Sequence, residues 1–199
     1  MAEEPTGSAR LEAFSDGVIA VVITIMVLEI KVPRANGLQG LRDLVPSLVV
    51  YLLSFWFTGV YWLNHQHLLR RARKAGHAIQ CANLGFLFCL SLLPLSTAYV
   101  VVKHLSGFAV AVYSALLFII AISFLWLRLA VHRHLQRRAD LSDEDRQGLR
   151  NHLFGIFFYA AGIPVAFFYP RPVLVAIALL TLIWILPNLS LQQARRLSD

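Results

Sequence analysis

Long apolar stretches without a charged side chain recur along the chain, and they constrain its fold more than any other feature. Five of them, at 45–63, 78–102, 105–127, 153–170 and 172–194, approach or exceed the roughly 20 residues that a helix needs to cross a bilayer. A sixth, at 11–30, is mostly apolar but contains Glu12, Asp16 and Glu29. Only 15% of the residues are charged, whereas soluble domains average about 25%. The sequence therefore predicts an all-α polytopic membrane protein, a single unit of six transmembrane helices over residues 1–199.

Lys and Arg are distributed unevenly between the connections. Of the 18, 13 fall before the first helix, between the second and third, in the polar segment at about 128–150, and after the sixth. Basic residues in short loops collect on the cytoplasmic side of a membrane. We therefore predict that both termini and the 128–150 loop are cytoplasmic. This topology accounts for the net charge of +7, so we expect a lipid bilayer and no nucleic acid as partner.

The first apolar segment carries carboxylates in an unusual place. On a helical wheel they share a stripe with aliphatic side chains, and Thr24 lies on its flank. The stripe consists of Glu12, Asp16, Ile19, Ala20, Ile23, Val27 and Ile30. Ionisable groups in membrane helices usually face a bundle interior or a wet cavity. An acidic mouth leading to an apolar stripe would suit a cation path with a hydrophobic constriction, but ordinary packing inside a bundle would explain the stripe equally well.

The motif at the head of this segment resembles a known signature. Arg10-x-x-x-Phe14-Ser15-Asp16 is similar to the RxxxFSD motif of the transmembrane protein 175 family, which are potassium-permeable channels of endosomes, lysosomes and their bacterial relatives. The stretch YWLNHQHLL at 61–69 resembles the end of the family's second helix. The stretch NLGFLFCLSLLPLSTAYV at 83–100 resembles its third. The resemblance covers all six predicted helices in order and is strongest in the first half of the chain.

The resemblance implies an assembly and a pore. Bacterial members with one six-helix unit per chain form homotetramers, and the first helix of each subunit lines a central pore. The implied constriction is a ring of Ile23, followed by Val27 and Ile30. Thr24 could add a hydroxyl that improves ion selection, or its hydroxyl could bond back to its own helix. A narrow apolar neck favours the ion that dehydrates more readily, so we expect modest selectivity for K⁺ over Na⁺.

The polar motif is expected to hold the first helix in place, because buried polar groups in lipid must be satisfied within the protein. The resemblance implies a helix-positioning network made of Arg10, Phe14, Ser15, Asp16, Trp62, Asn64, His65 and Asn83. The two His-x-His pairs, at 65–67 and 132–134, are not expected to bind metal, since residues i and i+2 of a helix point apart.

The resemblance therefore implies a potassium-permeable cation channel, and it also implies the plasma (inner) membrane of a prokaryote as its location. The permeant K⁺ and other monovalent cations are its only expected ligands, with no cofactor. The mid-membrane segments are almost free of ionisable residues, which argues against an enzyme. The alternative is a secondary or proton-coupled cation transporter, although no inverted repeat is evident.

Overall fold

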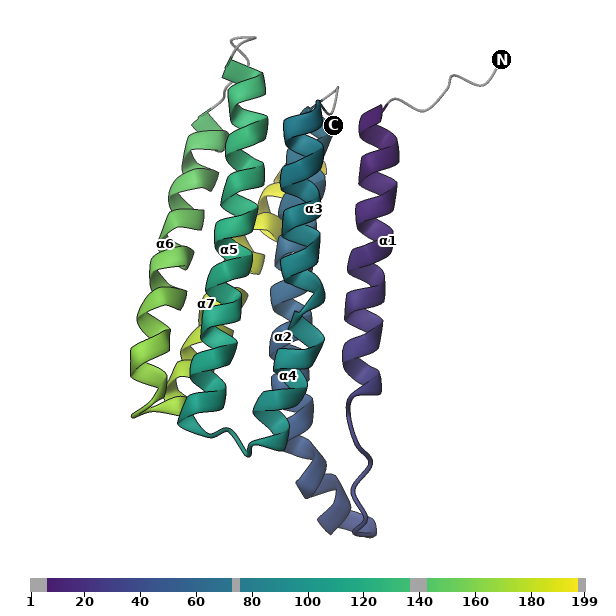
Figure 1. The fold of residues 1–199 in the computed structure, drawn as a ribbon, viewed down its shortest axis with the longest axis vertical. Coiled ribbons are helices and arrows are strands. Elements are labelled where there is room, and N and C mark those ends of the chain that lie inside the picture. The colour runs from purple at the N-terminus through teal and green to yellow at the C-terminus, as the bar shows by residue number, and fades with distance from the viewer. Residues whose placement is uncertain (1–6, 73–75, 137–142, 197–199) are drawn as a thin grey trace, which may run out of the picture.

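The chain folds into helices that run side by side (Figure 1). The computed structural model describes residues 7–72, 76–136 and 143–196, and it contains no strand in these ranges. The elements are α1 (Gly7–Leu28), α2 (Gly37–Arg71), α3 (His77–Ser91), α4 (Leu93–Val102), α5 (Gly107–Gln136), α6 (Asp143–Ala166) and α7 (Pro170–Arg196). The prediction of an all-helical protein is confirmed for this part of the chain. The segment predicted as a loop at about 128–150 is helical over 128–136 and 143–150, and the residues between lie outside the described ranges.

Four helical stretches are long and apolar enough to cross a bilayer. Within the described residues they are Ala9–Leu28, Gly37–Arg71, His77–Val102 and Gly107–Arg133, and α7 adds a shorter apolar stretch, Pro170–Trp184. Each of the six segments predicted from the sequence coincides with a helix or, at 78–102, with a pair of helices. The helix α2 extends beyond its predicted apolar segment at both ends, α5 at its C-terminal end and α6 at its N-terminal end, because polar residues continue them.

The third predicted helix is broken in two at Leu92. Pro94 lies in the first turn of α4, where the missing N–H group of proline costs no helical hydrogen bond. The same residue cannot donate to the preceding turn, so α3 ends at Ser91 and α4 begins a new helix at Leu93. Pro164 stays inside α6 without such a break.

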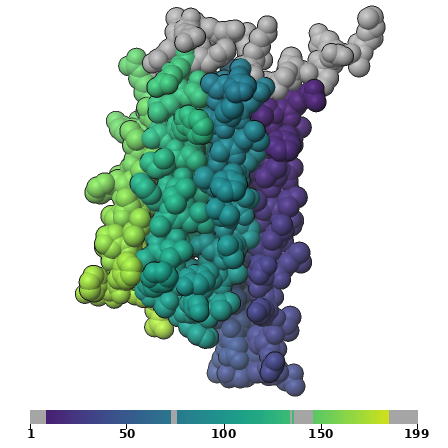
Figure 2. All heavy atoms as spheres, viewed as in Figure 1, coloured from purple at the N-terminus to yellow at the C-terminus, as the bar shows by residue number. Residues whose placement is uncertain are grey.

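The helix α1 forms one edge of the molecule, and α6 lies at the opposite edge (Figures 1 and 2). The helix α1 packs against α2, α3 and α4, while α5 packs against both α3 and α6. A cluster of aromatic rings fills the centre, with Tyr61 against Phe86 and Phe124 at centroid distances of 5.9 and 5.2 Å. The beginning of α1 and the end of α7 lie at the same end of the bundle.

Buried hydroxyl groups are joined to one another in the same core. Ser54 Oγ on α2 lies 2.8 Å from Thr97 Oγ1 on α4 and 2.9 Å from Tyr113 Oη on α5. Carbonyl groups of their own helices also lie 3.0 Å from Ser54 Oγ and 2.9 Å from Thr97 Oγ1, so each hydroxyl proton is shared between a carbonyl and a neighbouring hydroxyl. Three helices are thus linked by hydroxyls in surroundings that offer no water.

Gly155 allows α6 and α7 to approach closely, and this contact generates a prediction. A Cβ atom at Gly155 would collide with the Trp184 ring of α7. We expect Gly155→Ala to lower the free energy of unfolding by about 1–3 kcal/mol, because overpacking forces a ring or a helix to shift. Thermal unfolding of the purified protein in detergent measures this. Gly59→Ala is the matched control, since a Cβ there meets no atom within 4 Å. Equal stability of the two variants would contradict the prediction.

Candidate functional site

The side of α1 that faces the rest of the protein consists of buried residues that recur every three or four positions. Ser15, Ile19, Val22 and Met26 are all buried, and Ile19 and Met26 are each only 1% exposed. This spacing places them on one face of the helix. That face lies against α2, α3 and α4, so the opposite face of α1 is left uncovered within the chain.

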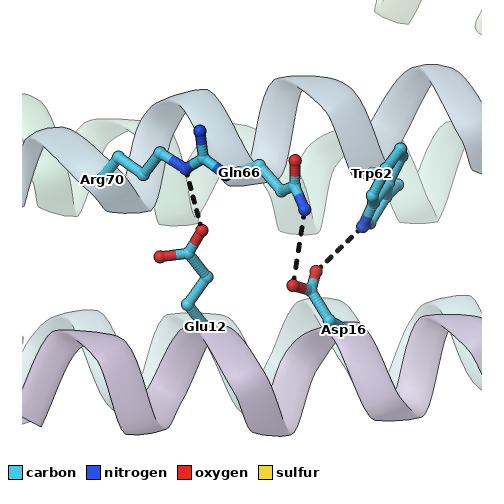
Figure 3. A network of polar contacts seen from close by, with 5 residues as sticks. All are labelled: Glu12, Asp16, Trp62, Gln66 and Arg70. Atoms are coloured by element: carbon cyan, nitrogen blue, oxygen red, sulfur yellow. Dashed lines mark hydrogen bonds and ion pairs between the residues drawn. The ribbon is translucent and has the colours of Figure 1, made fainter. Parts of the chain in front are cut away.

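The carboxylates of α1 are held by α2 (Figure 3). Trp62 Nε1 donates to Asp16 Oδ1 at 2.9 Å, and Gln66 Nε2 donates to Asp16 Oδ2 at 3.4 Å. One turn earlier on α1, Arg70 Nε donates to Glu12 Oε1 at 3.0 Å, which makes an ion pair. An open acidic mouth was one interpretation of the stripe, and in the single chain its carboxylates have partners on α2. The donors of a neighbouring helix take up both carboxylates.

Sequence reasoning anticipated Trp62 as a partner but missed Gln66 and Arg70. A signal for them was present. Trp62, Gln66 and Arg70 are spaced by four residues on α2, as Glu12 and Asp16 are on α1, so each set forms a row on its helix. Because α1 and α2 run antiparallel in the bundle, the two rows lie against each other with acidic and donor groups in register.

A second polar chain joins three helices and is completely buried. Asn83 Nδ2 on α3 donates to Ser15 Oγ on α1 at 2.9 Å, and Asn83 Oδ1 lies 2.7 Å from His65 Nε2 on α2. Ser15 Oγ in turn donates to the Leu11 carbonyl at 2.8 Å. Ser15, Asn83 and His65 are each 0% exposed. The structure therefore brings together Ser15, Asp16, Trp62, His65 and Asn83 around the first half of α1.

The remaining members of the predicted network lie elsewhere. Asn64 donates its side-chain amide to the Val60 carbonyl of its own helix at 2.8 Å. Arg10 and Phe14 are exposed on α1, Phe14 by 53%. These three side chains do not join the contacts that the described residues make between α1, α2 and α3.

The predicted constriction residues do not share one environment. Ile23 is half-buried and packs against the core, Val27 is 45% exposed, and Ile30 follows the end of α1 and is half-buried. Thr24 is exposed, but its Oγ1 donates to the Ala20 and Val21 carbonyls at 3.1 and 3.0 Å. The hydroxyl thus bonds back to its own helix while its side chain faces outward.

Most of the uncovered aliphatic surface of α1 is formed by residues other than the predicted Ile23, Val27 and Ile30. Val21, Ile25 and Leu28 are 54%, 41% and 80% exposed. Next to them, α1 and α4 border an apolar groove of about 740 Å³. Its walls include Phe14, Gly17, Val21 and Ile25 of α1 and Pro94, Leu95 and Ala98 of α4. Among the described residues, no group of three His, Cys, Asp or Glu side chains is placed to hold a metal ion.

The two donors on Asp16 generate a prediction for Asp16→Asn. Asparagine would keep an oxygen that accepts from Trp62, but it would lose the negative charge, and its N–H group would face Gln66, whose amide would have to turn to present its oxygen. We expect a loss of about 1.5–3 kcal/mol in stability, the range for hydrogen bonds to charged groups, together with partial loss of the native oligomer. Thermal unfolding and size-exclusion chromatography measure both. Asp43→Asn is the control, because exposed Asp43 accepts only from Gln39 on its own helix. An Asp16→Asn protein as stable as the control would refute the anchoring role.

Comparisons with known proteins agree with this arrangement. Residues 10–94 match the family model described as endosomal/lysosomal potassium channel TMEM175. A potassium channel of Chryseobacterium sp. is 37% identical over 185 residues, which is 93% of this chain and 96% of that protein. The human endosomal/lysosomal proton channel TMEM175 is 35% identical over 105 residues, which is 47% of this chain but only 21% of the human protein.

A solved structure shares the fold. The crystal structure of a lysosomal potassium-selective channel TMEM175 homolog from Chamaesiphon minutus superposes with a TM-score of 0.80 at 28% identity, covering 90% of this chain and 97% of that one. The family-model match over residues 10–94 includes the signature at the head of α1 and Trp62, His65 and Asn83. Similarity over nearly the whole length of the Chryseobacterium channel, together with this fold, shows that the chain belongs to the TMEM175 family of ion channels.

Proposed function

We propose that the protein is a potassium-permeable cation channel with modest selectivity for K⁺ over Na⁺. The observation that carries the proposal is the division of α1 into two sides. Its polar groups are engaged by α2 and α3, while a continuous aliphatic side is uncovered in the single chain. The relatives that are named potassium channels support K⁺ as the permeant ion.

The proposed assembly is a homotetramer with α1 of each subunit at the centre. One helix cannot surround an ion, but rotational symmetry repeats the same side of α1 around an axis. The firm attachment of α1 to α2 and α3 would keep four copies equivalent. The apolar groove between α1 and α4 provides a surface against which a neighbouring copy can pack.

The proposed topology has six crossings with both termini cytoplasmic, in the plasma membrane of a prokaryote. Arg70, Arg71 and Arg133 lie at the end of the bundle where α1 begins. Lys31 and Lys103 lie at the other end, which carries fewer basic residues. The positive-inside rule supports the first end as the cytoplasmic one. The sixth crossing requires α6, whose 24 residues would extend about 36 Å at 1.5 Å per residue.

The constriction is proposed to lie on the uncovered side of α1. The predicted set of Ile23, Val27 and Ile30 contributes Val27 to that side, whereas Ile23 packs against the core. Val21, Ile25 and Leu28 offer three exposed aliphatic residues on successive turns. Rings of such side chains make dehydration the barrier to permeation, which favours K⁺ because it gives up its water more readily than Na⁺. Thr24 lies between them with its hydroxyl turned back to the helix.

Flux measurements on two variants test the channel proposal and also which residues of α1 form the constriction. In liposomes containing the purified protein, we expect K⁺ flux to exceed Na⁺ flux. Ile25→Asn should bring the ratio of the two fluxes toward one, because an amide at the neck replaces part of the lost hydration. Ile23→Asn should leave the ratio unchanged and instead lower stability by about 1–3 kcal/mol, since its amide meets the core. Flux is followed with ion-selective dyes, and stability by thermal unfolding.

The opposite effects of the two asparagine variants would favour the constriction first predicted from the sequence. If Ile23→Asn changes the flux ratio and Ile25→Asn does not, then Ile23 forms the neck. A slow flux that saturates with cation concentration would favour the carrier alternative over the channel. Because the human relative is named a proton channel, a proton gradient without K⁺ is included as a separate condition. An intact oligomer that passes no cation under any condition would refute the channel proposal.

A further inference from the structure

The direction of the buried hydrogen-bond chain can be deduced from its last acceptor. The Leu11 carbonyl can only accept, so the Ser15 hydroxyl proton points to it. Ser15 Oγ must then accept from its other neighbour, which requires the amide nitrogen of Asn83 to face it. The carbonyl oxygen of Asn83 therefore faces His65, and His65 Nε2 must carry the proton that it donates. The chain thus specifies one tautomer of His65, with Nδ1 unprotonated.

His65 Nδ1 has no hydrogen-bond partner in the described chain. It is completely buried, and the imidazole stacks on the Phe86 ring at a centroid distance of 5.7 Å and an interplanar angle of 22°. In neutral His65 the unpaired Nδ1 carries only a lone pair, which costs little in apolar surroundings. In protonated His65 it would carry an N–H group without an acceptor on a positively charged ring, which costs far more. The closed arrangement therefore accommodates neutral His65 and disfavours the protonated form.

The charged and titratable groups around His65 do not supply the missing acceptor. On α1, Asp16 and Glu12 attract a positive charge on the ring, but their oxygens are engaged by Trp62, Gln66 and Arg70 of α2. On α3, the neighbours Asn83 and Phe86 are uncharged. On α5 lie Arg128 and His132, and on α6 lies His152, whose Nε2 bonds to the Ala121 carbonyl at 2.9 Å. None of these groups contacts Nδ1.

We propose that His65 Nδ1 is a proton-binding site that couples pH to the attachment of α1. In the closed arrangement the site is sealed, so a proton from water reaches Nδ1 only when the contact between α1, α2 and α3 opens. A ligand that binds one arrangement better shifts the population toward it. Acid therefore favours the opened contact. An imidazole that meets water takes up its proton between about pH 8 and pH 5, so the closed contact holds at neutral to alkaline pH and weakens as the pH falls.

The consequence for α1 follows from the adjacent motif residues. Opening the contact at Asn83 frees Ser15, which is one of the two side chains that set the rotation of α1. Asp16 stays bound to α2 through Trp62, so α1 turns or tilts but remains attached. A rotated α1 would present different side chains to the pore and so change the ion flux. This part of the proposal rests on the proposed channel function. We expect lower K⁺ flux at acidic pH.

The tautomer and its titration are measured first, without any assumption about transport. Long-range ¹H–¹⁵N NMR of histidine-labelled protein in detergent reports the proton on each ring nitrogen. We expect the Nε2–H tautomer of His65 at about pH 7.5, and its conversion to the charged ring as the pH is lowered, together with a chemical-shift change at Ser15 and Asn83. The Nδ1–H tautomer at neutral pH, or a titration of His65 that leaves Ser15 and Asn83 unchanged, would overturn the proposal.

The flux measurement uses variants that separate the donor from the titrating group. His65→Gln retains an N–H donor for Asn83 but cannot take up a proton, so its K⁺ flux should persist and lose its pH dependence. His67→Gln is the matched control, because His67 is exposed two residues away and should leave the dependence intact. Equal pH dependence in wild type and His65→Gln would overturn the coupling. If no variant passes cations at any pH, the channel proposal fails, and the NMR titration alone decides the proton site.

Discussion

The position of α1 depends on a single requirement, that its polar side chains be satisfied inside the bundle because lipid cannot satisfy them. Ser15 and Asp16 are adjacent in sequence and point about 100° apart on the helix. Asp16 is held by α2 and Ser15 by α3, so two contacts in different directions fix the rotation of α1 as well as its depth. A single contact would leave the helix free to turn. The arrangement of the whole uncovered side of α1 follows from this pair.

Beyond Arg10 and Phe14 near its beginning, the uncovered side of α1 is mainly aliphatic, with Val21, Ile25 and Leu28 exposed along it. Thr24 is the polar residue among them, but its hydroxyl group bonds back to the Ala20 and Val21 carbonyls of its own helix. An ion that passed this side would therefore meet methyl and methylene groups. Selection of this kind depends on hydration energy and ring diameter, not on ligands, and small changes in helix rotation would alter it.

The sequence predicted the helices of the described residues, but it could not decide the rotation of α1. Uncharged runs located the helices, because length and hydropathy leave few alternatives, but they predicted 78–102 as one helix, which the structure breaks at Leu92. The helical wheel correctly grouped Glu12, Asp16 and Ile19 on one stripe, but it did not tell which side of α1 faces the protein. In a membrane the buried, lipid-facing and pore-facing sides are all apolar, so hydropathy cannot distinguish Ile23 from Ile25. Partners distant in sequence, such as Gln66 and Arg70, decide the matter, and their spacing of four residues was the available clue.

The long sequence separation of these contacts has a consequence for biogenesis. The signature motif is synthesised first, but Asp16 finds its partner Trp62 46 residues later and Ser15 finds Asn83 68 residues later. Until α3 has left the ribosome, α1 enters the membrane with a carboxylate and a hydroxyl that lack their final partners. The helix made first therefore receives its last polar partner only when α3 has been made, and a chain truncated before α3 would present its signature motif to the translocon as a poorly inserting segment.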